Sequence, residues 1–452
     1  MKHSRNRFLF FIALGLFVLV ACGTAVSQSE PAADSSSEGS IEVEPTNTSQ
    51  PEPTDAPTDE PVPTETEPEV EAETEPPTEE PKADDGVEMV NGKPVLTEDD
   101  RPDRLTGLTA SWGTNWNRHI IDYDEILSGG PPRDGIPSID DPQFVTQDEA
   151  AEWLVDNEPV IALEIDGDAR AYPLQVLTWH EITNDVVGDV PVVVTFCPLC
   201  NSALVFDRRL GDETFEFGVS GLLRNSDLIM YDRTSETLWQ QFTGEAIVGD
   251  LVGEQLAFVP SGLVSFADFR EAYPEGVVQS RDTGFSRSYG QNPYAGYDSI
   301  GQNPFLFTGE LDGRLPAMER VVTLNLPDEN VDVAYPLSLL SEVGVIHDGQ
   351  SGQDIVVFHT DGTSSALGAS KIAEAEDVGA TGVFDPNLNG QMLTFSEVDG
   401  VIMDEETGSR WNVLGQATEG ELAGETLTPL AHGDHFWFSW AAFRPDTIIY
   451  GS

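Results

Sequence analysis

Hydrophobic positions divide the chain into three regions. Residues 8–20 form an uninterrupted apolar run, residues 23–95 hold few large apolar side chains, and short β-branched runs separated by Gly-containing turns recur from residue 96 onward. Runs such as Val190 to Phe196 are typical of buried strands, and turns such as Asn389-Gly390 are typical of hairpins. The pattern predicts an α+β fold that is predominantly β, with a few short helices.

The first apolar run has the features of a bacterial export signal. It follows Lys2, Arg5 and Arg7, is too short to cross a bilayer comfortably, and ends in Leu19-Val20-Ala21-Cys22. A small residue directly before a cysteine is typical of a lipobox. We therefore expect residues 1–22 to be a lipoprotein signal peptide and Cys22 to be acylated, which would anchor the chain to the cell membrane on its extracytoplasmic face. The alternative is an ordinary signal peptide with a stray cysteine.

Residues 23–95 are rich in Pro, Glu, Thr and Ser. Such a composition cannot bury enough apolar surface to offset the entropy of ordering, so we expect a disordered acidic stalk. The acid excess also extends beyond it, since 80 acidic and 22 basic residues give a formal net charge of −58. An acidic surface of this kind excludes nucleic acid as a partner and favours a plain solvated surface over any function specific to acids.

The chain also contains an internal repeat. Ala171-Tyr172-Pro173-Leu174 recurs as Ala334-Tyr335-Pro336-Leu337, and Val193-Val194 recurs at the same distance as Val356-Val357. The match continues from Asp232 to Trp239 against Asp404 to Trp411, and from Ala246 to Leu256 against Ala417 to Leu427. We expect two homologous β-rich subdomains related by a pseudo-twofold duplication. The predicted parts are a 96–160 N-terminal segment, a 161–280 first copy, a 281–325 connector and a 326–452 second copy.

Three features occur in the first copy alone. Cys197-Pro198-Leu199-Cys200 aligns with Thr360-Asp361-Gly362-Thr363, so the turn folds without cysteines in the second copy. His180 aligns with Val343 on an apolar helix face, which predicts that it points toward the core. The stretch 218–227, which includes Arg224 and Asp227, is longer than its counterpart. These differences indicate that the first copy carries the working site and that the second copy is scaffold.

The motifs of the first copy resemble a bacterial family known as domain of unknown function 3179. The resemblance covers nearly all of 120–452 and rests on long motifs: Thr178-Trp179-His180-Glu181, Cys197-Pro198-Leu199-Cys200-Asn201-Ser202-Ala203, and the stretch from Gly218 to Asp227. The family has no assigned reaction. Some similar proteins are labelled as candidate selenoproteins, and exchange of cysteine for selenocysteine would imply a redox or nucleophilic thiol.

Four interpretations of the cysteine pair remain open. In the first, Cys197 attacks as a thiolate and Cys200 resolves the mixed disulfide, with His180 or Arg224 lowering the thiol pKa and an unknown redox partner. In the second, Cys197, Cys200 and His180 hold zinc or copper, supplied by an unknown metal partner. A structural disulfide and a surface module that binds without chemistry are the others. Arg224 and Asp227 could also simply pair across a turn.

A thioredoxin fold is excluded on local grounds. In that fold a helix continues from the cysteine pair, whereas Leu204-Val205-Phe206 has the pattern of a strand that leads into a hairpin. The cysteine pair is therefore expected at the end of one strand and the beginning of another.

Overall fold

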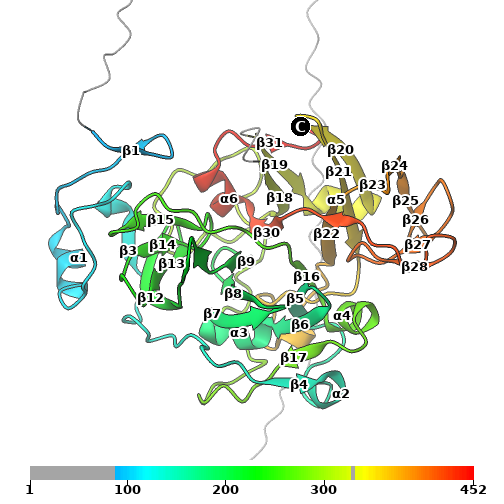
Figure 1. Cartoon of the computed structure of the whole chain (residues 1–452), viewed down its shortest axis with the longest axis horizontal. Helices are drawn as coiled ribbons and strands as arrows, with labels where there is room; N and C mark the ends of the chain where they lie inside the picture. The colour runs from blue at the N-terminus through cyan, green and yellow to red at the C-terminus, as the bar shows by residue number, and fades with distance from the viewer. Residues whose placement is uncertain (1–86, 327–330) are drawn as a thin grey trace, which may run out of the picture. The chain divides into compact units, whose positions relative to one another are not determined.

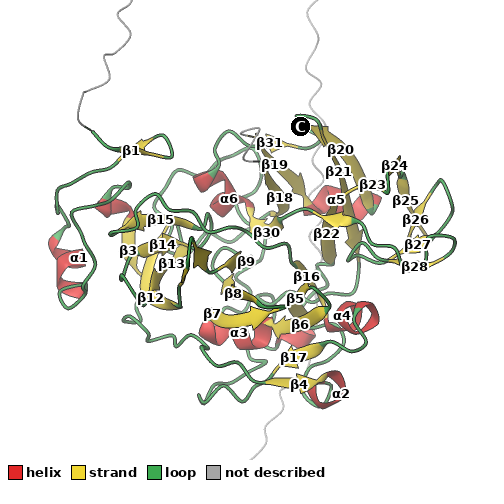
Figure 2. Cartoon of the chain, viewed as in Figure 1, coloured by secondary structure: helices red, strands yellow, loops and turns green. Residues whose placement is uncertain are grey.

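A computed structural model describes residues 87–326 and 331–452. Strands dominate this part of the chain, and its α-helices are short (Figure 2), which confirms the predicted α+β, mainly β, class. The helices are α1 (Asp103–Leu108), α2 (Gln147–Ala150), α3 (Leu174–His180), α4 (Phe266–Ala272), α5 (Leu337–Val343) and α6 (Trp437–Phe443). None of the helices in these ranges has the length and apolar character needed to span a bilayer.

Three sheets make up the first half of the described chain (Figure 1). One has the order β16-β5-β6-β17-β4, from Gly262–Ser265, Pro159–Ile165, Asp168–Pro173, Val277–Gln279 and Phe144–Thr146. The second is β7-β8-β9, from Ile182–Val187, Val190–Cys197 and Ser202–Asp207. The third is β15-β14-β13-β12-β3, from Glu245–Val248, Leu238–Gln240, Asp227–Asp232, Phe217–Arg224 and Ile126–Ser128.

The second half has three sheets with corresponding strand orders. The first is β30-β18-β19-β31, from His432–Phe436, Arg320–Leu326, Val331–Pro336 and Ile448–Ile449. The second is β20-β21-β22-β29, from Val345–Gln350, Gln353–Thr360, Ala380–Asp385 and Thr428–Pro429. The third is β25-β26-β27-β28, from Phe395–Val398, Val401–Asp404, Arg410–Trp411 and Ala417–Glu419.

Small two-stranded hairpins complete the two halves. They are β1-β2 (Met89–Val90 and Lys93–Pro94), β10-β11 (Arg209–Leu210 and Glu213–Thr214) and β23-β24 (Asn387–Leu388 and Gln391–Met392). The last of them lies at the turn predicted from Asn389-Gly390.

Each half also contains the same side-chain hydrogen bonds at equivalent positions. Tyr172 Oη donates to Asp185 at 2.6 Å, and Tyr335 Oη donates to Asp348 at 3.0 Å. Likewise, the indole N–H of Trp239 donates to Asp232, and that of Trp411 donates to Asp404. Duplication of one ancestral unit predicts this agreement of strand order and hydrogen bonds.

The contacts between the halves are reciprocal. Strand β9 contacts β30, and β22, the counterpart of β9, contacts β16, the counterpart of β30. A twofold relation requires contacts of this kind. The halves also share a hydrophobic core, in which Phe196 and Phe206 of the first pack in one cluster with Phe436 and Trp437 of the second. The described residues, 87–326 and 331–452, accordingly form one compact unit.

Strands of the structure lie inside two of the predicted ranges. The proposed stalk, 23–95, extends too far, because Met89–Val90 pairs with Lys93–Pro94 around an Asn91-Gly92 turn and Val95 is buried. The proposed connector, 281–325, includes most of β18, which begins at Arg320 because Arg320 to Leu324 pair with β30. The signal peptide, Cys22 and residues 23–86 of the stalk lie outside the described residues.

Candidate functional site

Cys197 and Cys200 lie in a tight turn between two strands. Strand β8 ends at Cys197, β9 begins at Ser202, and the Cys200 backbone N–H donates to the Cys197 carbonyl at 3.2 Å. The strand that follows the turn confirms that this is not a thioredoxin site. Both side chains are free thiols, and both are buried.

Asp227 reaches these thiols from the tip of the β12–β13 hairpin. One sulfur atom from each cysteine and one carboxylate oxygen of Asp227 lie within 4.8 Å of one another, and we call these three residues the thiol cluster. Asp227 Oδ2 accepts hydrogen bonds from Gln240 Nε2 at 2.6 Å and from the Phe242 backbone N–H at 3.0 Å. Among the described residues Oδ1 has no nitrogen or oxygen partner, which leaves it available to the thiols.

The hairpin reaches the cluster because it is longer than its counterpart in the second half. Strand β12 covers Phe217–Arg224, whereas β25 covers Phe395–Val398. A bulge between Val219 and Leu222 bends β12, and Gly221 has φ 76° there, where a Cβ would overlap the Pro131 carbonyl. The additional residues in the first copy therefore place Asp227 beside the cysteines.

Glu181 adds a second carboxyl group to this region. It ends α3, and its side chain lines a cavity of about 80 Å³ together with Cys197, Leu199 and Tyr294. Its φ is 60°, in the left-handed region that side chains with a Cβ rarely adopt. Strain of this kind persists where the surroundings hold a residue in place, and such residues cluster at functional sites.

Burial controls the protonation of all four groups. It raises the pKa of the Cys197 thiol, and it raises that of Cys200 well above its ordinary value, with the neighbouring Cys197 adding to the shift. Burial also raises the pKa of Asp227 to about 7 and, with the nearby charge of Asp227, raises the pKa of Glu181 to about 8. Near neutral pH the thiol cluster and Glu181 thus combine protonated thiols with two carboxyl groups that can gain or lose a proton.

Residues 280–319, between β17 and β18, form no helix or strand, and we call them the cover segment. Tyr297 Oη donates to the Leu199 carbonyl, inside the cysteine turn, at 3.0 Å and accepts from the Phe305 backbone N–H at 3.1 Å. Ser226, next to Asp227, donates to the Phe305 carbonyl. The cover segment therefore closes over the thiol cluster and is more than the simple connector expected from the sequence.

Comparison with known proteins places this site within a family. The model of a family described as a protein of unknown function, DUF3179, matches residues 133–447. The chain belongs to the DUF3179 family. No curated protein and no solved structure matches it.

His180 of this DUF3179 protein is not part of the thiol cluster. Its ring is buried as predicted, but Nδ1 donates to the Pro137 carbonyl at 2.7 Å and Nε2 accepts from Tyr289 Oη at 2.7 Å. With both ring nitrogens bonded, and with burial lowering its pKa, His180 is a neutral imidazole that holds the cover segment through Tyr289. The candidate ligand atoms that lie together are those of Cys197, Cys200 and Asp227, whereas the sequence suggested Cys197, Cys200 and His180.

Arg224 is also directed elsewhere. Its Nε forms a 2.6 Å ion pair with Glu125, and its guanidinium lies 5.4 Å from the centre of the Phe443 ring. It does not pair with Asp227, although the two residues are opposite each other in the β12–β13 register. The expectation that His180 or Arg224 lowers the thiol pKa is wrong, because burial raises it and the charged neighbours with the strongest effect are carboxylates.

Glu181 and the tyrosines of the cover segment were missed in the sequence. Glu181 stands in the Thr178-Trp179-His180-Glu181 motif and aligns with Gly344, and this exchange of a glycine for a carboxylate was the available signal. Tyr294 and Tyr297 have no counterpart in the repeat, so comparison of the copies gave no signal for them.

Proposed function

We propose that Cys197 and Cys200 form a redox-active dithiol that exchanges with a disulfide and uses Asp227 as its proton acceptor. The observation that carries the proposal is that the two free thiols of a buried turn and the carboxylate of Asp227 lie within 4.8 Å of one another. A buried thiol with a raised pKa reacts only if a nearby base takes its proton, because the thiolate is the nucleophile. A carboxylate with a pKa of about 7 is suited to this at neutral pH.

Cys197 is the attacking residue in this proposal because it lines the cavity, whereas Cys200 is fully buried. Asp227 accepts the Cys197 proton, the Cys197 sulfur bonds to one sulfur of the substrate disulfide, and the other substrate sulfur leaves as a thiolate and receives that proton. Cys200 then gives its proton to Asp227 and attacks Cys197. The Cys197–Cys200 bond forms, and the second substrate sulfur leaves and is protonated. Two electrons and two protons pass to the substrate.

A metal centre is the second candidate, favoured by the same three ligand atoms. Two thiolates and one carboxylate would hold zinc with one position open, or would offer soft sulfur ligands to copper. A cation would also compensate the negative charge that the thiols and carboxylates acquire when they ionise. In this alternative Asp227 takes the place that the sequence suggested for His180.

We propose further that the protein works at the extracytoplasmic face of the cell membrane, held by a lipid on Cys22. The support is the Leu19-Val20-Ala21-Cys22 sequence after an apolar run. An oxidising compartment of this kind permits dithiol–disulfide cycling, and a membrane anchor would restrict the partner to the envelope. We propose that this partner is a redox protein or a metal-delivering protein of the envelope.

Trapping of the intermediate tests the redox proposal. With dithiobis(nitrobenzoate) as the disulfide, Cys200→Ser should accumulate a mixed disulfide at Cys197, and Cys197→Ser should not. Asp227→Asn should slow the exchange at pH 7 by about 100-fold, the range of a general base. Glu158→Gln is the matched control, because Glu158 is a buried carboxyl with a raised pKa outside the thiol cluster. Equal rates in Asp227→Asn and wild type would refute the role of Asp227.

Metal analysis of untagged protein separates the two candidates. The redox proposal expects no stoichiometric metal and a Cys197–Cys200 bond that forms and is reduced reversibly. The metal alternative expects one bound ion, thiols protected from alkylation until a chelator is added, and loss of the ion in Asp227→Ala but not in His180→Ala. Free thiols that neither exchange nor bind metal would exclude both.

A further inference from the structure

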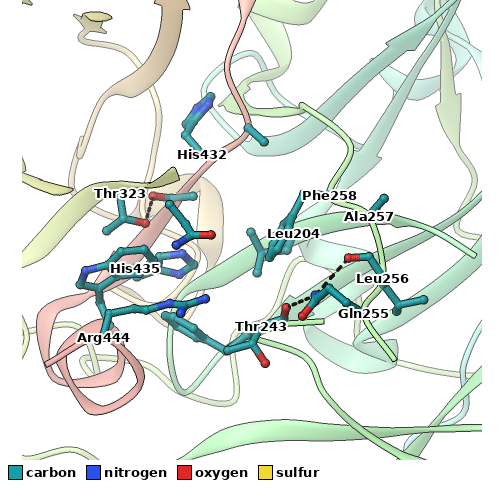
Figure 3. Close-up of a pocket in the computed structure, with 15 residues that line it drawn as sticks. Leu204, Thr243, Gln255, Leu256, Ala257, Phe258, Thr323, His432, His435 and Arg444 are labelled. Atoms are coloured by element: carbon teal, nitrogen blue, oxygen red, sulfur yellow. Dashed lines mark hydrogen bonds between the residues drawn. The ribbon is translucent and has the colours of Figure 1, made fainter. Parts of the chain in front are cut away.

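A second cavity, with a volume of about 480 Å³, lies between the two halves of the chain. Its walls come from β9 and the loops around β15 in the first half, and from β18, β30 and α6 in the second. In Figure 3, His435 and Arg444 lie on one side of the hollow, and Leu256 and Gln255 lie on the other. A cavity of this size is large enough for a small organic molecule. It does not include the cysteines or Asp227.

The charge of this cavity is opposite to that of the chain. The sequence has 80 acidic residues against 22 basic ones. Among the described residues that line the cavity there is no Asp or Glu, and Arg444 is the one with a permanent charge. Its ion pair with Asp332 is long, at 3.6 Å, and Asp332 already accepts a 2.7 Å hydrogen bond from Asn325. The guanidinium therefore retains capacity for an anion.

His435 supplies a buried polar group that needs a partner. The residue is 2 % exposed, and Nδ1 has no hydrogen-bond partner within the described ranges. Burial lowers its pKa to about 3, so the ring is neutral at pH 7 and presents one N–H and one lone pair. A buried polar atom without a partner is rare in folded proteins and is commonly satisfied by water or a ligand.

The remaining walls are aromatic and aliphatic. The Phe242 and His435 rings are 4.4 Å apart, and the Trp440 ring stacks on His435 at 5.7 Å with an interplanar angle of 12°. Leu204, Leu256 and Phe258 complete the apolar side. Flat apolar walls of this kind favour a flat ring, and polar groups on one side fix its orientation.

We propose that this cavity binds a small aromatic carboxylate. Its ring packs between the aromatic wall of Phe242 and Trp440 and the aliphatic wall of Leu204 and Leu256. Its carboxylate accepts hydrogen bonds from Arg444 and from the N–H of His435. The proposal does not depend on the redox chemistry of the thiols, although Phe242 borders both regions through its backbone bond to Asp227.

The test uses 2-naphthoate as the probe, with 2-naphthalenemethanol as the uncharged analogue and acetate as the anion without a ring. Calorimetry on the wild-type protein should show saturable binding of one 2-naphthoate per chain and none of acetate. Arg444→Gln should weaken 2-naphthoate about tenfold or more, the loss expected for one charge-assisted hydrogen bond, and should leave the affinity for the alcohol within about threefold. The imidazole nitrogen resonances of His435 should shift on binding.

Two further variants make the outcome decisive. Ala431→Phe adds a ring at a residue that lines the cavity and should abolish binding while the melting temperature stays unchanged. Cys197→Ser with Cys200→Ser should bind 2-naphthoate as the wild type does, which separates this proposal from that for the thiol cluster. Absence of saturable 2-naphthoate binding, or equal affinity in Arg444→Gln and wild type, would overturn it.

Discussion

The backbone φ angle is 60° at Glu181 and 70° at Gly344, the residues that end α3 and α5. In both turns the backbone N–H bonds back into the helix, and the carbonyl accepts a 2.8 Å hydrogen bond from the neighbouring strand, from Phe196 in one case and from His359 in the other. One half thus uses a glycine where the other keeps a carboxylate in the same unfavourable conformation. This difference indicates that Glu181 is retained for its carboxyl group rather than for its fit to the backbone.

Replacement of Glu181 by glycine should therefore stabilise the fold. We expect Glu181→Gly to raise the free energy of unfolding by about 1 kcal/mol, because it relieves the strained φ and removes a buried carboxyl group. Urea unfolding at pH 7 measures this. The matched control is Gly344→Ala, which should destabilise by about 1–2 kcal/mol because its Cβ would lie 2.6 Å from Glu397 Cβ. A loss of stability in Glu181→Gly would contradict the strain argument.

Asp227 should make the stability depend on pH. Its pKa is about 7 in the folded chain and about 3.9 when unfolded, so the folded state binds more protons between these values. The stabilisation of the folded state that results from this proton binding is complete below pH 4 and is lost as the pH rises toward 7. Glu181 affects the stability in the same direction up to about pH 8.

Asp227→Asn should remove part of this dependence of the free energy of unfolding on pH. Relative to wild type, its free energy of unfolding should increase between pH 5 and pH 8 by a few kcal/mol at most, at about 1.4 kcal/mol per unit of pKa shift. Urea titrations of both proteins at the two pH values give the difference. No change in this difference between the two pH values would show that Asp227 is ionised in the folded state throughout this range.

The cover segment should control access to the thiols. Tyr297→Phe removes the hydroxyl that bonds Leu199 and Phe305, a loss of about 1–2 kcal/mol from the closed arrangement. We expect iodoacetamide to alkylate Cys197 about tenfold faster in this variant at unchanged pH. Tyr450→Phe, in the second half, is the control. Equal alkylation rates in all three proteins would mean that the segment does not limit access.

The hairpin at residues 89–94 should mark the true start of the folded region. Asn91 and Lys93 both bond to Glu245, and Val95 is buried, so these residues contribute packing and polar contacts. A chain that begins at residue 85 should melt at nearly the full-length temperature. One that begins at residue 96 should melt several degrees lower. Equal melting temperatures would mean that the hairpin does not stabilise the folded region and belongs to the stalk.

The lipid anchor is tested by Cys22→Ala. This variant should fail to incorporate labelled fatty acid and should be recovered uncleaved or in soluble form, since the thiol that carries the acyl chain is missing. Labelled palmitate and membrane fractionation provide the readouts. Incorporation into the variant equal to that of wild type would rule out Cys22 as the anchor.

Sequence patterns predicted the class of fold and some of the residues that lie at the candidate site. Periodicity located the strands around Cys197, and comparison of the two copies singled out the cysteines and the longer hairpin that carries Asp227. This comparison could not predict which side chains contact one another at the site. Which group reaches the thiols depends on how β12 bends at Gly221, and the direction of His180 depends on Tyr289, far away in sequence. Thiol pKa values depend on burial, which is a property of the assembled core.

The contacts at Cys200 have a consequence for biosynthesis. Its carbonyl accepts a hydrogen bond from the Phe436 backbone N–H at 3.0 Å, so a segment that is translated well after the cysteines closes the turn that holds the thiols. While the nascent chain lacks that segment, the cysteines remain open to oxidants and metal ions in their surroundings. Oxidation or metal binding at the thiols is therefore easiest in the interval between synthesis of Cys200 and synthesis of β30.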